Sequence, residues 1–211
     1  MARILLVYSS LFGANAQLAA LAEAALGAAG ADVRVRRVRE VALTGEEQAA
    51  AEGAQIATGA DLTWAEGFVF CSPSHTGLLS ASMKAFIDQH HDSAAAGAHL
   101  NKTFTAMATS GYAHAGQERV VDELNAVGAA WGCVIVAPGT ADEGLNVHNG
   151  NPYGLSFVLE HGRLPGSAET TGVLRRHLHR LVAVTDALAP LRAADARTGT
   201  RTVPTIAGAL T

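Results

Sequence analysis

The start of the chain decides the fold and reads RILLVYSSLFGAN over residues 3–15. Residues 3–8 form an almost continuous apolar run that stops at two serines, which is typical of a strand buried on both faces of a parallel sheet. After Gly13 the leucines follow helical spacing, and this pattern ends at the glycine-rich turn at 27–30. The first unit is therefore predicted to be a strand, a loop and a helix.

The same unit recurs along the chain. The further strands are predicted over 33–38, 67–72, 102–107 and 133–137. The further helices are predicted over 79–90, over a segment that ends near 131, and over 168–190, with one irregular helix within 41–60. Strands that alternate with helices form a parallel sheet with right-handed crossovers. The predicted fold class is thus α/β, an open doubly wound five-stranded parallel sheet with helices on both faces.

One domain is expected over 1–190, followed by a C-terminal tail at 191–211. Within the domain, segment 139–167 is rich in Gly, Pro and Asn and shows no periodicity. Aperiodic connections of that length are usually functional or disordered, so this segment is interpreted as an insertion or lid.

Composition limits the classes of function. The 211 residues are 49% hydrophobic and 16% charged with a formal net charge of -4, which excludes a disordered chain and provides no long basic surface for nucleic acid. No apolar run approaches the length of a membrane span and no basic, apolar leader precedes the first strand. We therefore expect a cytoplasmic protein that binds neither nucleic acid nor membrane.

In open α/β sheets, ligands bind outside the carboxyl ends of the strands. The loop after the first strand offers Ser10, Gly13 and Asn15 at the start of a helix, where free backbone N–H groups and the helix dipole favour an anion. The glycine patterns of ATP-binding and dinucleotide-binding loops are both missing from it. The loop thus predicts an anion site without lysine, or alternatively a helix N-cap turn made by Ser10 or Asn15.

Two further polar loops follow the next two strands of this type. They read PSHTG at residues 73–77 and SGYAH at 110–114. Three such loops at one sheet edge join a phosphate-sized site to a shelf of backbone amides and flat side chains. This combination suits a ligand with a phosphate at one end and a planar heterocycle at the other, as in flavin mononucleotide (FMN).

Four segments, in order along residues 3–190, resemble the flavodoxin-like NAD(P)H:quinone oxidoreductases of the WrbA type. They are residues 10–15, 72–89, 116–118 and 151–154, of which 72–89 is the most specific. The resemblance implies the flavodoxin-like strand order 2-1-3-4-5, FMN as cofactor and NAD(P)H as co-substrate. It also implies a quinone or quinone-like aromatic acceptor and a homodimer or homotetramer.

The resemblance further implies which residues contact FMN. The phosphate and ribityl end would be held by Ser10, Phe12, Gly13, Ala14 and Asn15. The residues along the isoalloxazine ring would be Pro73, Ser74, His75, Thr76 and Gly77. The site would be closed by Ser110, Gly111 and His114, and by Trp131 from a neighbouring subunit. His75, Thr76 and Trp131 depart from the family's usual arginine, phenylalanine and histidine. The resemblance therefore does not define the pocket for the acceptor.

Two side chains are candidates for catalysis. His114 is expected to donate a hydrogen bond to a quinone oxygen or to the flavin, or else to be a solvated loop histidine. Tyr112 is expected to cover the ribityl chain or the acceptor, or else to pack its loop, and Trp131 has the same alternative of a packing role. No metal site is predicted, because His177 and His179 do not share a helix face.

Because these loops carry histidines and no carboxylate, they favour the anionic two-electron reduced flavin. The predicted function is therefore FMN-dependent transfer of two electrons from NAD(P)H to the acceptor. A flavodoxin-like electron carrier and a flavin-free interaction protein on the same fold remain as alternatives. A hydrolase is disfavoured, since the chain has no Gly-x-Ser-x-Gly elbow.

Overall fold

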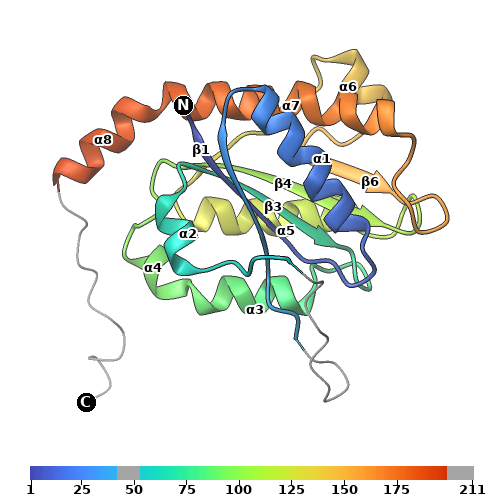
Figure 1. The fold of residues 1–211 in the computed structure, drawn as a ribbon, viewed down its shortest axis with the longest axis horizontal. Helices are drawn as coiled ribbons and strands as arrows, with labels where there is room; N and C mark the ends of the chain where they lie inside the picture. Colours follow the sequence, from blue (N-terminus) through green and yellow to red (C-terminus); the bar gives the residue numbers. More distant parts are fainter. Residues whose placement is uncertain (42–52, 199–211) are drawn as a thin grey trace.

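The computed structural model describes residues 1–41 and 53–198, and its centre is a parallel sheet (Figure 1). The strands named in order along the chain are β1 (Arg3–Tyr8), β2 (Asp32–Arg37), β3 (Gly67–Pro73), β4 (Thr103–Ser110) and β5 (Val134–Ile135). Their order in the sheet is β2-β1-β3-β4-β5, and all pairs are parallel. This confirms the flavodoxin-like strand order.

A sixth strand, β6 (Leu155–Val158), corrects the expected count of five. Both β5 and β6 pair with β4, since Thr103 is opposite Val134 while Met107 is opposite Leu155. Two short strands thus share the outer edge of β4, and the chain between them leaves the sheet to form α6 (Glu143–His148). The segment 139–167 therefore contains regular structure, which was missed because four strand residues are too few to show a period.

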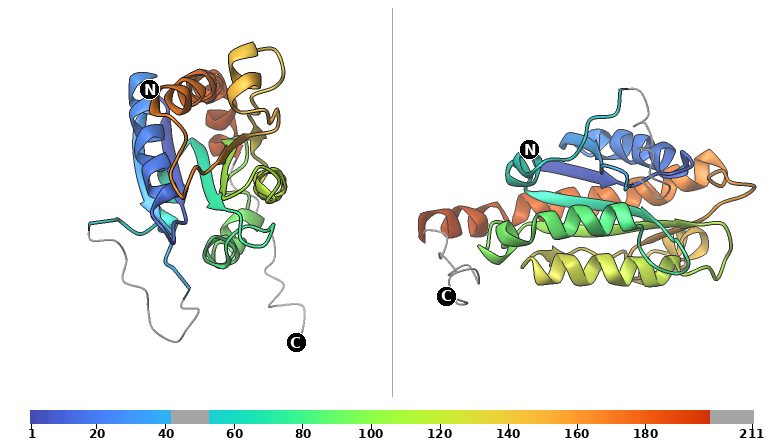
Figure 2. Two further views of the ribbon diagram at one scale, coloured as in Figure 1. Left: turned by 90° about the vertical axis from the view of Figure 1, so that its right-hand side faces the viewer. Right: turned by 90° about the horizontal axis from the view of Figure 1, so that it is seen from below.

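Helices cover both faces of the sheet (Figure 2). One face is covered by α1 (Ala14–Ala28) and α7 (Ser167–Ala187), and the other by α3 (Ala81–Gln89) and α5 (Gln117–Ala130). Successive side chains of β1 point to opposite faces of the sheet and so enter both hydrophobic cores. Leu6 packs against α1 and α7, whereas Leu5 packs on the side of α3 and α5. This explains why β1 reads as a continuous apolar run.

Three shorter helices complete the described fold. They are α2 (Gly59–Trp64), α4 (His91–Ala95) and α8 (Ala189–Thr198). Part of the expected tail is thus helical, and α8 continues α7 away from the body (Figure 1). The helix expected within 41–60 begins only at Gly59, and residues 42–52 of that prediction lie outside the described residues.

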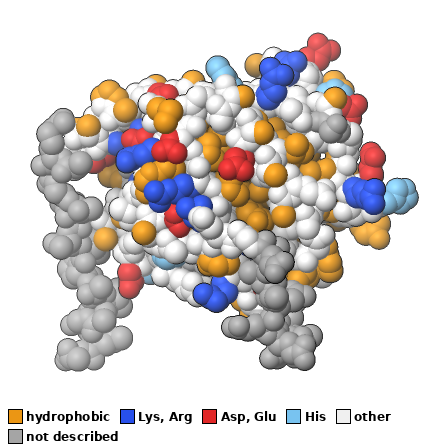
Figure 3. Space-filling model, in the orientation of Figure 1, with side chains coloured by type: hydrophobic (Ala, Val, Ile, Leu, Met, Phe, Trp, Pro, Cys, Tyr) orange, Lys and Arg blue, Asp and Glu red, His pale blue; other side chains and the backbone are white. Residues whose placement is uncertain are grey.

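The three arginines of β2 are paired with acidic side chains. Arg34 and Arg36 lie 3.2 and 3.1 Å from a carboxylate oxygen of Asp61. Burial acts to raise the pKa of Asp61, but hydrogen bonds from Thr58 and the charge of Arg36 outweigh it and lower the pKa. Figure 3 shows basic and acidic side chains intermixed on this face of the molecule. In the described part of the chain, no helix has the length and hydropathy that crossing a membrane requires.

Candidate functional site

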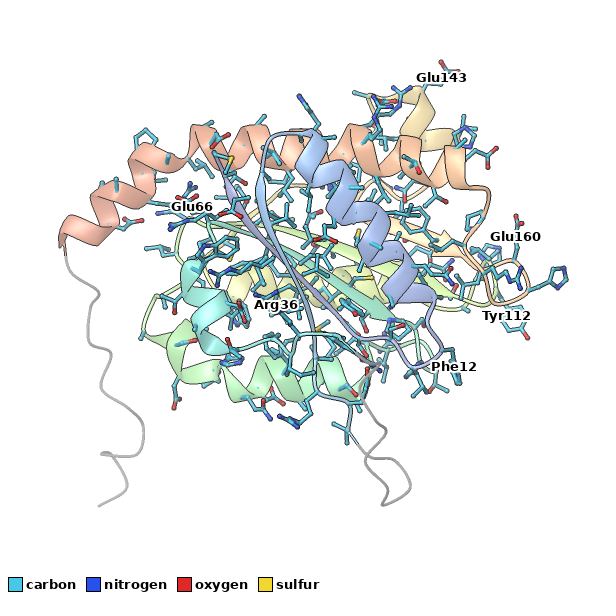
Figure 4. All side chains as sticks on the ribbon, viewed as in Figure 1. Phe12, Arg36, Glu66, Tyr112, Glu143 and Glu160 are labelled. Carbon is cyan, nitrogen blue, oxygen red and sulfur yellow. The ribbon has the colours of Figure 1, made fainter. Side chains whose placement is uncertain are left out.

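The carboxyl ends of β1, β3 and β4 bring the three polar loops to one edge of the sheet. The Ser9 N–H donates to the Cys71 carbonyl at 3.0 Å, and the Ser74 N–H donates to the Thr109 carbonyl at 2.8 Å. Figure 4 shows Phe12 and Tyr112 at this end of the sheet. The structure therefore brings the predicted loop residues together.

The first loop leads into α1 through a left-handed glycine. Gly13 has φ 90° at the N-cap of α1, and no side chain caps it. The Ser10 hydroxyl accepts from the Ala16 N–H at 3.2 Å, so this serine partly fulfils the alternative capping role. The backbone N–H groups of Ala14 and Asn15 have no acceptor among the described residues. These two donors and the positive end of the helix dipole are the elements of an anion site.

The side chain of Asn15 connects the first loop to the sheet through two hydrogen bonds. It is only 2% exposed; its Nδ2 donates to the Ser9 carbonyl at 2.9 Å, and its Oδ1 accepts from the Thr109 hydroxyl at 2.7 Å. The amide thus ties the end of β1 to the end of β4. The backbone N–H of Asn15 takes no part in this bridge.

Arg37 is a residue that the sequence analysis missed. Its Nη2 donates to the Ser10 carbonyl at 2.8 Å, and Glu40, paired with this arginine, accepts from the Ser10 N–H at 3.2 Å. The loop that is expected to bind an anion without a lysine therefore has a buried guanidinium bonded to its backbone. The sequence signal was weak, because Arg37 looks like one more polar residue in a row of arginines.

The second loop is a tight two-residue turn. The His75 N–H donates to the Leu78 carbonyl at 2.9 Å, and the Leu78 N–H donates back at 3.1 Å. Thr76 and Gly77, the central residues, have φ values of 55° and 83°. This backbone matches a type I′ turn, in which Thr76 is exposed and His75 is half-buried.

The third loop is organised by Gln117, which lies in the segment 116–118 of the family resemblance but to which the sequence analysis gave no role. Its Oε1 accepts from the Ser110 hydroxyl at 2.8 Å, and its Nε2 donates to the Ala113 carbonyl at 2.6 Å. The Ser74 hydroxyl donates to the Ala115 carbonyl at 2.6 Å, which joins the second loop to the third. A buried amide with partners inside one loop fixes the loop backbone.

The candidate catalytic residues lie on the exposed side of this loop. Tyr112 is 79% exposed and Phe12 87% exposed, and the side chain of His114 is also exposed. A fourth loop lies beside them, because the Leu159 N–H that follows β6 donates to the Ser110 carbonyl at 2.7 Å. Figure 4 shows Glu160 of this loop near Tyr112. The expected lid segment thus contributes to the edge that the sequence analysis identified.

Trp131 is the one predicted site residue that the structure places elsewhere. It caps the end of α5, and the next residue, Gly132, accepts from the Asn101 N–H at 3.0 Å just before β4 begins. This is the amino end of the sheet, opposite the loops. The indole is 6% exposed and contacts Phe70 and His99 at centroid distances of 5.7 and 4.7 Å. Its packing role corrects the expected flavin contact.

Comparisons with known proteins place the chain in a family. Residues 2–143 match the family described as NADPH-dependent FMN reductase. A relative from Deinococcus radiodurans, named NAD(P)H dehydrogenase (quinone), is 36% identical over 165 residues, which is 74% of this chain and 82% of the relative. A relative of the same name from a Chelativorans species is 33% identical over 184 residues, or 82% of this chain and 92% of the relative.

Solved structures share the fold. A WrbA-like flavodoxin from Agrobacterium tumefaciens superposes with a TM-score of 0.63 at 16% identity, covering 89% of this chain and 99% of its own. A variant of the Pseudomonas aeruginosa flavodoxin gives a TM-score of 0.57 at 14% identity, covering 87% of this chain and 99% of its own. Both likenesses concern the fold alone.

Proposed function

Because the chain belongs to the NADPH-dependent FMN reductase family, we propose that it is an FMN-dependent oxidoreductase that transfers two electrons from NAD(P)H to a quinone or quinone-like aromatic acceptor. The names of the two relatives support quinones as the acceptor class. The observation that carries the proposal is the pair of free N–H groups of Ala14 and Asn15 at the amino end of α1, where β1 ends and beside two further polar loops.

The residues at this edge fit FMN. A Cβ at Gly13, Gly77 or Gly111 would meet nothing within 4 Å, so each loop has open space where a ligand would lie. The free N–H groups at the start of α1 suit a phosphate, while the loops that follow β3 and β4 present backbone and small polar side chains. Neither of these two loops places a carboxylate at residues 73–77 or 110–116.

Each loop has its own task in this proposal. The first loop, residues 10–15, holds the phosphate through backbone N–H groups, and residues 73–77 and 110–114 lie along the ring. When bound, FMN supplies the group that accepts a hydride from NAD(P)H, so the protein has to bind, orient and shield. Phe12 and Tyr112 shield the site from water, and His114 donates a hydrogen bond to an oxygen of the acceptor.

Absorbance and kinetics on one sample test this function. Purified protein mixed with FMN should show a shifted visible flavin band, and it should oxidise NADPH faster when benzoquinone is added. Visible flavin binding without acceleration by benzoquinone would favour the electron carrier. A protein indifferent to FMN would instead be an interaction protein on this fold.

The proposal extends to assembly and location. The exposed Phe12 and Tyr112 would be covered in a homodimer or homotetramer that completes the site between subunits. Flavin retention should then fall on dilution, and retention independent of protein concentration would contradict the assembly. Cys71 and Cys133 are both free thiols, which suits a reducing compartment such as the cytoplasm.

A further inference from the structure

The end of β2 and the residues that follow it bind both backbone groups of Ser10 in the first loop. Arg37 Nη2 donates to the Ser10 carbonyl at 2.8 Å, and Glu40 Oε1 accepts from the Ser10 N–H at 3.2 Å. The two side chains also pair with each other, with Arg37 Nη2 3.3 Å from Glu40 Oε1. One ion pair therefore binds both the backbone N–H and the backbone carbonyl of Ser10.

This ion pair is buried, unlike most ion pairs at protein surfaces. The side chains of Arg37 and Glu40 are 8% and 7% exposed. Buried charges are tolerated when they are paired and when hydrogen bonds satisfy their remaining donors and acceptors, as the Ser10 peptide does here. Their geometry is therefore held by partners on more than one segment.

The backbone next to Glu40 is also anchored, through Val41. The N–H of Val41, the residue after Glu40, donates to the Ser82 hydroxyl at the start of α3 at 3.0 Å. The segment from Arg37 to Val41 thus connects β2, the first loop and α3. A rigid connection of this kind reduces the freedom of the loop before a ligand binds.

The pair selects which loop donors remain free. Glu40 takes the Ser10 N–H, and the Ser10 hydroxyl takes the Ala16 N–H. An anion at this site is thereby limited to the donors between them, at the start of α1. The pair contacts the phosphate end of the proposed FMN site and lies on a different segment from the ring loops.

We propose that the buried Arg37–Glu40 pair positions the backbone of Ser10 and thereby makes the first loop selective for a flavin that carries a phosphate. This inference rests on the proposed FMN binding. Neither side chain acts on the reacting atoms. Their effect passes through the backbone of the loop.

Variants that keep the net charge separate positioning from simple electrostatics. Arg37→Lys keeps the positive charge but removes the fork that reaches both the Ser10 carbonyl and Glu40. The double variant Arg37→Gln/Glu40→Gln keeps the net charge of the pair at zero. The matched control is Lys84→Gln/Asp88→Gln, which removes an ion pair whose side chains are 57% and 62% exposed.

The readout is flavin release when the loaded protein is diluted, followed by flavin fluorescence for FMN and for riboflavin, which lacks the phosphate. Both Arg37 variants should weaken FMN binding about tenfold, the loss expected for a misplaced charge-assisted hydrogen bond, and riboflavin binding by less than about twofold. The control should leave both affinities unchanged. Thermal unfolding of each loaded variant shows that it is folded, and if the double variant does not fold, Arg37→Lys decides.

Three results would overturn the inference. An Arg37→Lys protein that prefers FMN over riboflavin as strongly as the wild type would show that the pair does not set the selectivity. An equal loss of both flavins would show general support of the fold. A wild-type protein that retains no FMN would refute the proposed function and this inference with it, so the two failures are distinguishable.

Discussion

Gly77 and Gly116 touch through their backbones, and this contact joins the two ring loops of the site. A Cβ built on Gly116 would lie 2.5 Å from the Gly77 Cα, closer than any side chain tolerates. Both residues have positive φ values, 83° and 88°, which favour glycine. The turn after β3 can therefore lie against the start of α5 only if residue 116 carries no side chain.

The first prediction concerns this contact. Gly116→Ala combines a left-handed backbone with a steric clash and should lower the free energy of unfolding by about 2 kcal/mol, while also weakening the binding of FMN and riboflavin alike. Chemical denaturation and flavin titration measure the two effects. Gly172→Ala is the control, because this helical glycine has no neighbour within 4 Å of its Cβ position; it should be neutral or stabilising by up to about 1 kcal/mol. Equal behaviour of the two variants would contradict the argument.

The second prediction concerns the support beneath the anion loop. Asn15→Ala leaves the Ser9 carbonyl and the Thr109 hydroxyl without their buried partner. We expect a loss of about 2 kcal/mol in the free energy of unfolding, measured by urea denaturation. Asn146→Ala removes an exposed hydrogen bond from the side-chain amide to the Thr140 carbonyl, and it should lower the free energy of unfolding much less. If Asn15→Ala is as stable as the wild type, the amide does not tie β1 to β4.

The third prediction separates the ring end from the phosphate end. Gln117→Ala removes the bonds that hold the loop after β4, so we expect FMN and riboflavin to lose affinity by a similar factor, about tenfold. The test is the same flavin titration as for the Arg37 variants. A selective loss of FMN would contradict this division of the site, because the loop would then act on the phosphate.

The fourth prediction is a pH dependence of stability. Burial and the charge of Arg180 lower the pKa of His177 to about 4, and burial and Lys102 lower that of His99 to about 4. Below the ordinary histidine pKa, the unfolded chain binds protons that the folded chain does not, so stability is complete above about pH 6.5 and falls as the pH drops towards 4. Each histidine contributes up to about 1.4 kcal/mol per pH unit.

Urea unfolding at pH 7 and pH 5 measures this loss. His177→Gln should reduce the difference between the two pH values by about half, since one of the two histidines no longer titrates. His179→Gln changes an exposed histidine on the same helix and should leave the difference as it is in the wild type. A stability that does not change between pH 7 and pH 5 would contradict the assignment of both buried imidazoles.

Sequence patterns predicted the parts of this molecule that repeat. The apolar runs of β1 and β3 and the polar loops that follow them were visible because burial on both faces leaves a continuous signal. The strand β6 was not visible in the sequence, because its four residues form a strand only by pairing with β4. Strand pairing depends on distant residues, which the local pattern does not record.

The hydrogen-bond partners of side chains were the other part that the sequence could not predict. The amide of Gln117 and the guanidinium of Arg37 act through bonds to loop backbone, and nothing in the spacing distinguishes them from solvated polar residues. Trp131 was misplaced for a related reason: an aromatic residue at a helix end packs inward as readily as it faces a ligand. The loops could thus be identified from sequence, while the residues that support them could not.

The central claim is that the amino end of α1 holds the phosphate of FMN, and the affinities of the wild-type protein for FMN and riboflavin test it most directly. Several charge-assisted hydrogen bonds to backbone N–H groups should make FMN bind about a hundredfold more tightly than riboflavin. Equal affinities for the two flavins would contradict the claim.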